Sequence, residues 1–205
     1  MKIHKQETKF SCGVACLRTI FNSYGNNFSE KDIWNKHESI LQNGYIRNPI
    51  LNLGVTALKF GFNVKYIGFN PILMNNNKYN DLKKSLKEKS KRFKGFGKSY
   101  VEEAVKFLEL KGKIKFEKFN LEKIKKILDK NKFVLVEIKP SFINKKASLS
   151  MNHKIILIEY NKKGFIYLNP YDAKKHIVDF DTFLLSFYAA IPELLIIQQK
   201  SQLFY

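Results

Sequence analysis

The sequence lacks a long apolar run and has few cysteines. No stretch reaches the roughly 18 consecutive apolar residues needed to cross a membrane, and the polar residues 1–9 hold no apolar core of a secretory signal peptide. The two cysteines, Cys12 and Cys16, lie four residues apart on one expected helix, which is a poor framework for a disulfide. These absences predict a cytoplasmic protein with no membrane span.

Acidic residues are scarce beside basic ones. The chain has 37 Lys and Arg against 18 Asp and Glu, which gives a formal net charge of +19. Such a charge favours an anionic partner, but the lysines are dispersed among apolar positions and no arginine-rich tract is present. An AT-rich coding bias also produces this abundance of Lys, Asn, Ile, Phe and Tyr. We therefore expect no nucleic-acid partner, and the lysine excess favours an acidic peptide or protein.

The remaining composition is that of a folded globular protein. The chain has 205 residues, of which 44% are hydrophobic and 27% charged, and this is the size of one domain. We expect a single domain over residues 1–205, in which a lysine-rich helical segment at about 75–119 forms an insertion. No feature of the sequence indicates an oligomeric state.

Hydrophobic periodicity predicts helices first and strands last. We expect helices near residues 13–24, 29–36, 49–60, 79–92, 100–110, 121–129 and 181–188, with a break at 95–97. We expect strands near residues 63–69, 113–119, 133–139, 154–160, 164–168 and 194–199. This order predicts an α+β fold with an antiparallel sheet in the C-terminal part.

The most informative motif is Gln6 followed by Cys12-Gly13-Val14-Ala15-Cys16-Leu17. A cysteine in the first turn of a helix lies near free backbone N–H groups and the positive end of the helix dipole, which favour the thiolate. The Gln6 side chain is expected to join the Cys12 backbone N–H in binding an oxyanion. The motif therefore predicts a cysteine nucleophile for acyl transfer.

A cysteine nucleophile needs a histidine to accept its proton and a polar group to orient the ring. His153 stands at the head of an apolar strand, and Asn169 ends the next strand just before a proline. If the two strands form a hairpin with a loop of three or four residues around 161–163, Asn169 falls beside His153, with its amide oxygen at ring Nδ1. Asp172 is the alternative orienting residue.

The other histidines and the second cysteine have no such setting. His4, His37 and His176 are expected at the surface, and Cys16 is expected to pack in the core. A zinc site built on Cys12 and Cys16 would depart from the common two-residue spacing of such ligands. We expect no metal and no cofactor.

These motifs resemble those of papain-like cysteine peptidases, and above all the bacteriocin-processing family that removes double-glycine leader peptides. Gln6 and residues 12–17 are similar to that family's Gln followed by Asp-Cys-Gly-x-Ala-Cys-Leu. His153 and Asn169 also follow the cysteine in the order, and at about the distance, typical of papain. The resemblance implies a papain-like fold, in which an N-terminal helical part carrying the nucleophile packs on a C-terminal antiparallel sheet.

The resemblance also implies roles for four residues: Cys12 as the nucleophile, His153 as general base and acid, Asn169 as the orienting residue and Gln6 as the oxyanion donor. It implies a peptide or protein substrate and hydrolysis through an acyl-thioester on Cys12. Two alternatives stay open, which are a papain-like acyl or amide transferase and a peptide-binding module with little catalysis.

Three positions depart from the family pattern. Ser11 stands where the family has an aspartate before the cysteine, and Asn169 stands where the family has the aspartate of the triad. Lys154 follows His153 where an aromatic or apolar residue is more usual.

Overall fold

The computed structural model describes residues 2–42, 45–74, 81–148 and 150–200. Its strands are β1 (Ile40–Gln42), β2 (Tyr45–Arg47), β3 (Asn63–Gly68), β4 (Lys113–Phe116), β5 (Val134–Ile138), β6 (His153–Asn161), β7 (Gly164–Asn169), β8 (Lys174–Val178) and β9 (Glu193–Gln198). Its helices are α1 (Cys12–Ser23), α2 (Glu30–Lys36), α3 (Ile50–Lys59), α4 (Leu82–Ser90), α5 (Gly95–Glu109), α6 (Leu121–Lys130) and α7 (Phe180–Ala189), with a 3-10 turn η1 at Pro140–Phe142.

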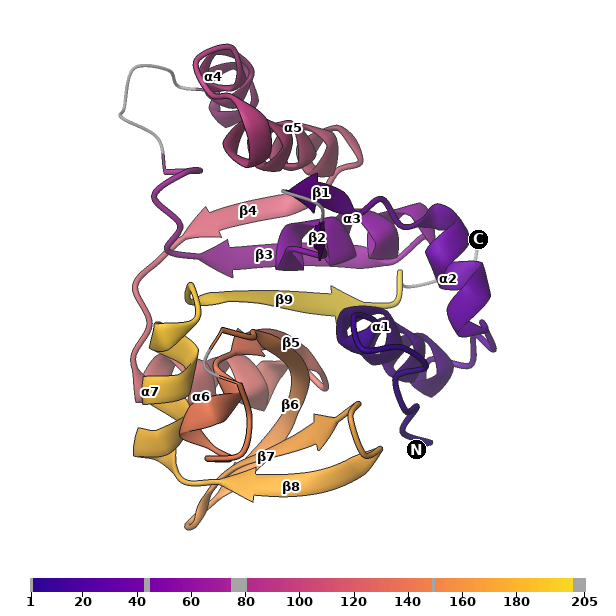
Figure 1. Cartoon of the computed structure of the whole chain (residues 1–205), viewed down its shortest axis with the longest axis vertical. Coiled ribbons are helices and arrows are strands. Elements are labelled where there is room, and N and C mark those ends of the chain that lie inside the picture. The colour runs from indigo at the N-terminus through magenta and orange to yellow at the C-terminus, as the bar shows by residue number, and fades with distance from the viewer. Residues whose placement is uncertain (1, 43–44, 75–80, 149, 201–205) are drawn as a thin grey trace.

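One seven-stranded sheet, in the order β4-β3-β9-β5-β6-β7-β8, organises the molecule (Figure 1). The β3–β4 pair is parallel and the other pairs of this sheet are antiparallel. Parallel neighbours need a crossover connection, and helices α4 and α5 lie on it between β3 and β4. The α+β fold is as predicted, but the sheet also takes two strands from the first part of the chain.

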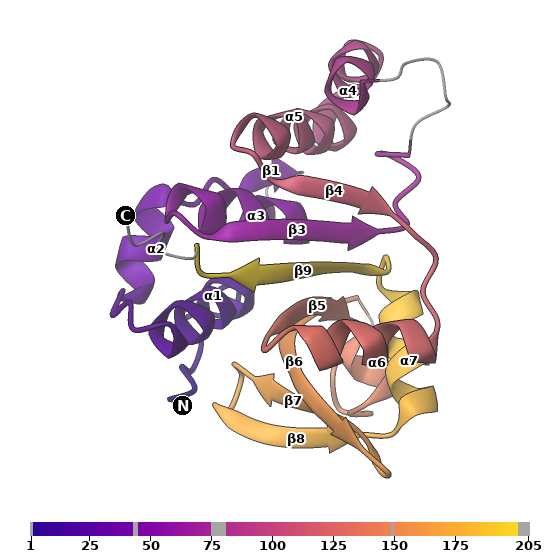
Figure 2. The ribbon, with the colours of Figure 1, turned by 180° about the vertical axis from the view of Figure 1, so that it is seen from behind.

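Helices cover both faces of this sheet. Helices α1, α3 and α5 pack on one face, against side chains such as Leu135, Ile156 and Leu195. Helices α6 and α7 pack on the other face, against side chains that alternate with those three along the same strands, such as Val136, Leu157 and Leu194. Figure 2 shows both helices beside the β5–β8 half of the sheet. Because both faces are covered, the central strand β9 is a continuous apolar run over residues 194–197 rather than an alternating one.

Local sequence signals set several helix ends. The Ser29 hydroxyl and the Asp32 carboxylate form a capping box at the start of α2. The Asn120 side chain accepts a hydrogen bond of 2.9 Å from the Lys123 backbone N–H and caps α6. No helix within the described ranges has the length and apolar character to cross a membrane.

Three expectations about elements were wrong. Residues 95–97 begin α5 instead of breaking a helix, and Gly95, the first of them, has a positive φ of 53° that glycine adopts without strain. The β6–β7 loop holds two residues, because Asn161 pairs with Gly164. Strand β8 was missed because this edge strand is mostly exposed and carries no apolar alternation. Of the helix expected near 79–92, residues 79–80 lie outside the described residues.

Candidate active site

Cys12 begins helix α1, as predicted, and is 9% exposed. The Ser11 hydroxyl turns back to Thr8, accepting from its backbone N–H at 2.9 Å and donating to its carbonyl at 3.2 Å. Ser11 therefore makes no side-chain cap on α1. The N–H groups of the first turn are left to act on the Cys12 sulfur and on any anion beside it.

His153 and Asn169 lie together, at the start of β6 and the end of β7. The Asn169 Oδ1 is 2.8 Å from His153 Nε2 and accepts a second hydrogen bond of 3.1 Å from the Tyr171 backbone N–H. Because this atom is an acceptor, His153 Nε2 carries the hydrogen, and Nδ1 of the neutral ring has a free lone pair. This ring interacts with Cys12, since the contact between them lowers the pKa of the thiol and raises the pKa of the imidazole.

The expected ring atom was therefore wrong, since Asn169 contacts Nε2 and not Nδ1. Strand register explains the difference. Leu168 pairs with Ile156 in antiparallel register, so Asn169 lies level with Ile155. Ile155 is two residues along β6 from His153. The far nitrogen of the imidazole reaches across this diagonal.

The two thiols of α1 are in opposite electrostatic settings. Burial raises the pKa of Cys12, but its contact with His153 and the charge of Lys154 outweigh burial and lower that pKa below its usual value. Burial raises the pKa of Cys16 well above its usual value, and its Sγ lies 3.5 Å from the Lys154 carbonyl oxygen. Burial lowers the pKa of His153, yet its contacts with Cys12 raise it overall. Cys12 and His153 therefore favour a thiolate–imidazolium pair.

Gln6 adjoins the turn that carries Asn169. Its backbone N–H donates to the Pro170 carbonyl at 2.8 Å, and its side-chain Nε2 donates to the Thr8 carbonyl at 2.8 Å. Its Oε1 is buried and has no hydrogen-bond partner among the described residues. The structure thus brings Gln6 to the turn that follows Asn169, although the two positions are far apart in sequence.

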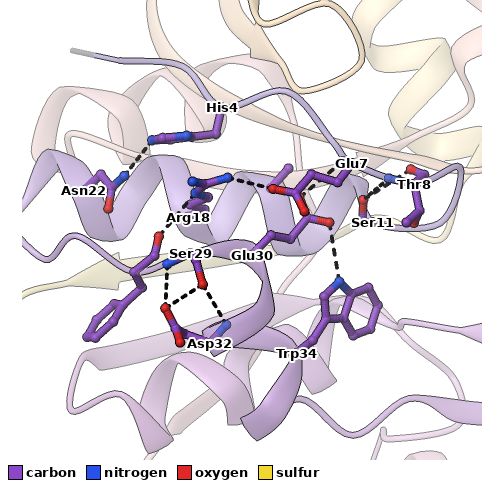
Figure 3. A network of polar contacts seen from close by, with 12 residues as sticks. His4, Glu7, Thr8, Ser11, Arg18, Asn22, Ser29, Glu30, Asp32 and Trp34 are labelled. Atoms are coloured by element: carbon purple, nitrogen blue, oxygen red, sulfur yellow. Dashed lines mark hydrogen bonds and ion pairs between the residues drawn. The ribbon is translucent and has the colours of Figure 1, made fainter.

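The segment before Cys12 is held on helices α1 and α2 by the contacts in Figure 3. The Glu7 carboxylate pairs with Arg18 at 3.0 Å, and the Glu7 backbone N–H donates to Glu30 at 3.3 Å. Buried Glu30 also accepts from the Trp34 indole at 3.4 Å. These contacts fix the backbone between Gln6 and Cys12.

Two histidines expected at the surface are buried. The His4 ring lies 2.6 Å from Asn22 Nδ2, also shown in Figure 3. The His37 ring contacts Thr56 at 2.8 Å and Asn48 at 2.9 Å. Paired polar neighbours remove the desolvation cost that would otherwise keep these rings outside.

The third histidine, His176, contacts Asp172, which was the alternative residue for orienting His153. His176 Nε2 is 2.7 Å from the Asp172 carboxylate, across the turn between β7 and β8. Asp172 thus pairs with His176, and Asn169 is the residue in contact with His153.

Sequence reasoning missed a buried charged group next to these residues. Lys154 is 8% exposed, and its ammonium lies 3.0 Å from the Glu137 carboxylate. Glu193, also buried, accepts from the Tyr100 hydroxyl at 2.9 Å and from the Asn70 amide. The signal was a charged residue inside an apolar strand, which a fold with both sheet faces covered must bury.

Metal binding has no ready site in the described part of the chain. No group of three or more His, Cys, Asp or Glu side chains is arranged there to hold an ion.

A family model described as Peptidase_C39 like family matches residues 1–193. Among solved structures, the peptidase domain of Streptococcus ComA, a bi-functional ABC transporter, is similar with a TM-score of 0.54 and 14% identity, covering 97% of this chain and 98% of that one. A double glycine motif protease from an AMS/PCAT transporter, solved with a leader peptide, is similar with a TM-score of 0.51 and 14% identity, covering 96% of this chain and 90% of that one. No curated protein matches. The likeness in fold confirms the predicted papain-like architecture.

Proposed function

The chain belongs to the Peptidase_C39 like family, and from this premise we propose that it is a cysteine peptidase that cleaves a peptide or protein through an acyl-thioester on Cys12. One observation carries the proposal. The His153 ring and the Cys12 thiol each shift the pKa of the other, and the ring is held through Nε2 by Asn169 at 2.8 Å. That arrangement gives the sulfur a proton acceptor that is already held in the productive tautomer.

Acylation follows from these contacts. The Cys12 thiolate attacks the scissile carbonyl carbon, a C–S bond forms, and the carbonyl electron pair moves onto oxygen. His153, protonated in the thiolate–imidazolium pair, gives its proton to the amide nitrogen as the C–N bond breaks. The amine product leaves, and the acyl group stays on sulfur as a thioester.

Hydrolysis returns the enzyme to its starting state. The now neutral His153 takes a proton from water, whose oxygen attacks the thioester carbonyl. The C–S bond breaks, and the acid product leaves with the sulfur restored as thiolate. Asn169 keeps Nε2 protonated through both steps, so that Nδ1 remains the nitrogen that exchanges protons.

The oxyanion is stabilised from the first turn of α1. The Cys12 backbone N–H is one donor. Gln6 is the proposed second donor, because its amide nitrogen carries two hydrogens and one donates to the Thr8 carbonyl. Its backbone bond to Pro170 supports this role, since it ties Gln6 to the turn beside Asn169.

Leader-peptide processing is the specific substrate class that we propose. The supporting observations are the family match and the likeness in fold to a double glycine motif protease that was solved with a leader peptide.

The test is cleavage of synthetic peptides by the wild type and by Cys12→Ala, followed by mass spectrometry. We expect the wild type to cleave after a double-glycine sequence and Cys12→Ala to lose turnover by several orders of magnitude. Cys16→Ala, which removes the neighbouring buried thiol of the same helix, is the matched control and should retain turnover. Unchanged cleavage by Cys12→Ala would refute the assignment. Added amine appearing in the product would instead indicate a transferase.

A further inference from the structure

A buried ammonium group lies beside the proposed nucleophile. Lys154 directly follows His153 on β6, and its side chain is only 10% exposed. Its charge is balanced by Glu137, whose side chain is 14% exposed and which is its cross-strand partner on β5. The Asn152 amide also donates to Glu137, so this carboxylate is held from two sides.

The fold itself does not require a cation at this position. The residues that follow on β6, from Ile155 to Leu157, are fully buried and apolar. Burial of an ion pair is costly, and well-packed apolar residues replace such pairs without loss of stability in many proteins. A lysine here therefore indicates a role outside the packing of the sheet.

The side chain and the main chain of Lys154 both face helix α1. Ile156, two residues further along, packs in the core between α1 and the sheet, so that strand alternation puts Lys154 on the same face. The Lys154 carbonyl lies 3.5 Å from Cys16 Sγ, one helical turn along α1 from Cys12. The ammonium charge lowers the pKa of Cys12, as expected for a cation near a thiolate.

Other titratable groups also face Lys154 and set its balance of charge. They are Glu137 on β5, His153 on β6, Glu193 on β9, His37 after α2, and Cys12 and Cys16 on α1. Burial raises the pKa of Glu193 to about 7, so that this carboxyl is mostly protonated in acid. In that range Glu137 is the carboxylate that opposes the Lys154 charge.

We propose that Lys154 is a positioning residue for the nucleophile, and that its buried ammonium, held by Glu137, favours the Cys12 thiolate over the thiol. The same cation disfavours the His153 imidazolium, so that it displaces both titrations of the pair toward lower pH. This inference rests on the proposed function, in which Cys12 is the nucleophile.

The test is the rate of Cys12 alkylation by iodoacetamide as a function of pH. The thiolate sulfur forms a bond to the methylene carbon and displaces iodide, so the rate follows the thiolate fraction. No Lys or Arg lies between Cys12 and Cys16, so one tryptic peptide contains both, and the label is assigned to Cys12 by fragmentation of that peptide in the mass spectrometer. Circular dichroism is recorded for each variant to check folding.

Lys154→Met removes the charge at similar length and is expected to move the acid limb of alkylation upward by about one pH unit. Lys154→Arg keeps the charge and should leave the limb in place. Lys98→Met removes the same formal charge from an exposed lysine of α5, whose side chain is 52% exposed, and should also leave it in place.

Glu137→Gln supplies an independent test with the opposite sign. It removes the opposing carboxylate while Lys154 stays charged in acid, so the acid limb should move to lower pH. A general loss of structure would not move the two variants in opposite directions. If the acid limb of Glu137→Gln moves upward or stays in place, the proposal is overturned. This variant alone tests the proposal if Lys154→Met does not fold.

The outcomes distinguish a failure of Cys12 as the nucleophile from a failure of Lys154 as its positioning residue. If the wild-type limb lies at the ordinary pH of a free thiol, near 8.5, the proposed nucleophile itself fails. If the wild-type limb is low and Lys154→Met leaves it there, only the role of Lys154 fails.

Discussion

Replacing Asn169 by aspartate adds a negative charge to the contact with His153 while preserving its shape. Asn169 uses one oxygen to accept from His153 Nε2 at 2.8 Å and from the Tyr171 backbone N–H at 3.1 Å. A carboxylate oxygen accepts both bonds equally well. Asn169→Asp therefore changes the electrostatics of the ring more than its geometry.

The added charge stabilises the imidazolium form of His153. A carboxylate within hydrogen-bond distance raises the pKa of a histidine by about 1–3 units, and partial exposure of His153 places the effect at the low end. One unit corresponds to about 1.4 kcal/mol. Since His153 already has a raised pKa, the variant adds to an existing shift. The Cys12 thiolate lies on the other side of the ring and should respond less.

The assay is kcat/KM for peptide cleavage against pH, with the imidazole titration of His153 followed by NMR. We expect the basic limb to move upward by about one unit and the acid limb by less. Asn161→Asp is the matched control, since Asn161 is an exposed residue at the other end of the β6–β7 hairpin whose side chain accepts from the Lys163 N–H at 2.8 Å. A basic limb that stays in place in Asn169→Asp would refute the assignment of His153 and Asn169 as a working pair.

Two further predictions concern stability. Because burial raises the pKa of Glu193 to about 7, its protonated form stabilises the fold at acid pH, and this contribution is lost as pH rises from about 4.5 to about 7. We expect Glu193→Gln to remove this pH dependence of the free energy of unfolding, which amounts to at most about 3 kcal/mol. Urea unfolding at pH 5 and pH 8 measures the difference. A slope that Glu193→Gln leaves unchanged would contradict this reasoning. Gly164→Ala should destabilise by about 2–3 kcal/mol or more, because Gly164 has a φ of 143° and an added Cβ would lie 1.9 Å from the Val178 carbonyl oxygen. An unchanged urea midpoint for this variant would show that the β6–β7 turn relaxes.

Local features of the sequence could be predicted, because neighbouring residues determine them. Helix α1 begins at Cys12, and the caps of α2 and α6 are formed by Ser29 and Asn120. The approach of His153 to Asn169 also followed from one hairpin, since the two residues are 16 positions apart. Such contacts need only periodicity and turn chemistry.

Contacts between distant segments could not be predicted in the same way. The Lys154–Glu137 pair depends on which strands become neighbours and on their register. The hydrogen bond from Gln6 to Pro170 joins two segments that are far apart in the sequence. A single sequence contains no signal for strand order, so the insertion of β9 between β3 and β5 was also beyond reach. The same strand order decided that the lysine would be enclosed.

The central position of β9 has a consequence for synthesis. Strands β3 and β4 on one side, and β5 to β8 on the other, are hydrogen-bonded to one another only through β9 within the described chain. Translation delivers β9 after all of these strands, and pairings of long sequence separation form slowly. A nascent chain thus contains Cys12 long before β9, and it closes its sheet only after residue 198 leaves the ribosome. The order of synthesis therefore leaves the two halves of the sheet unconnected until β9 has been made.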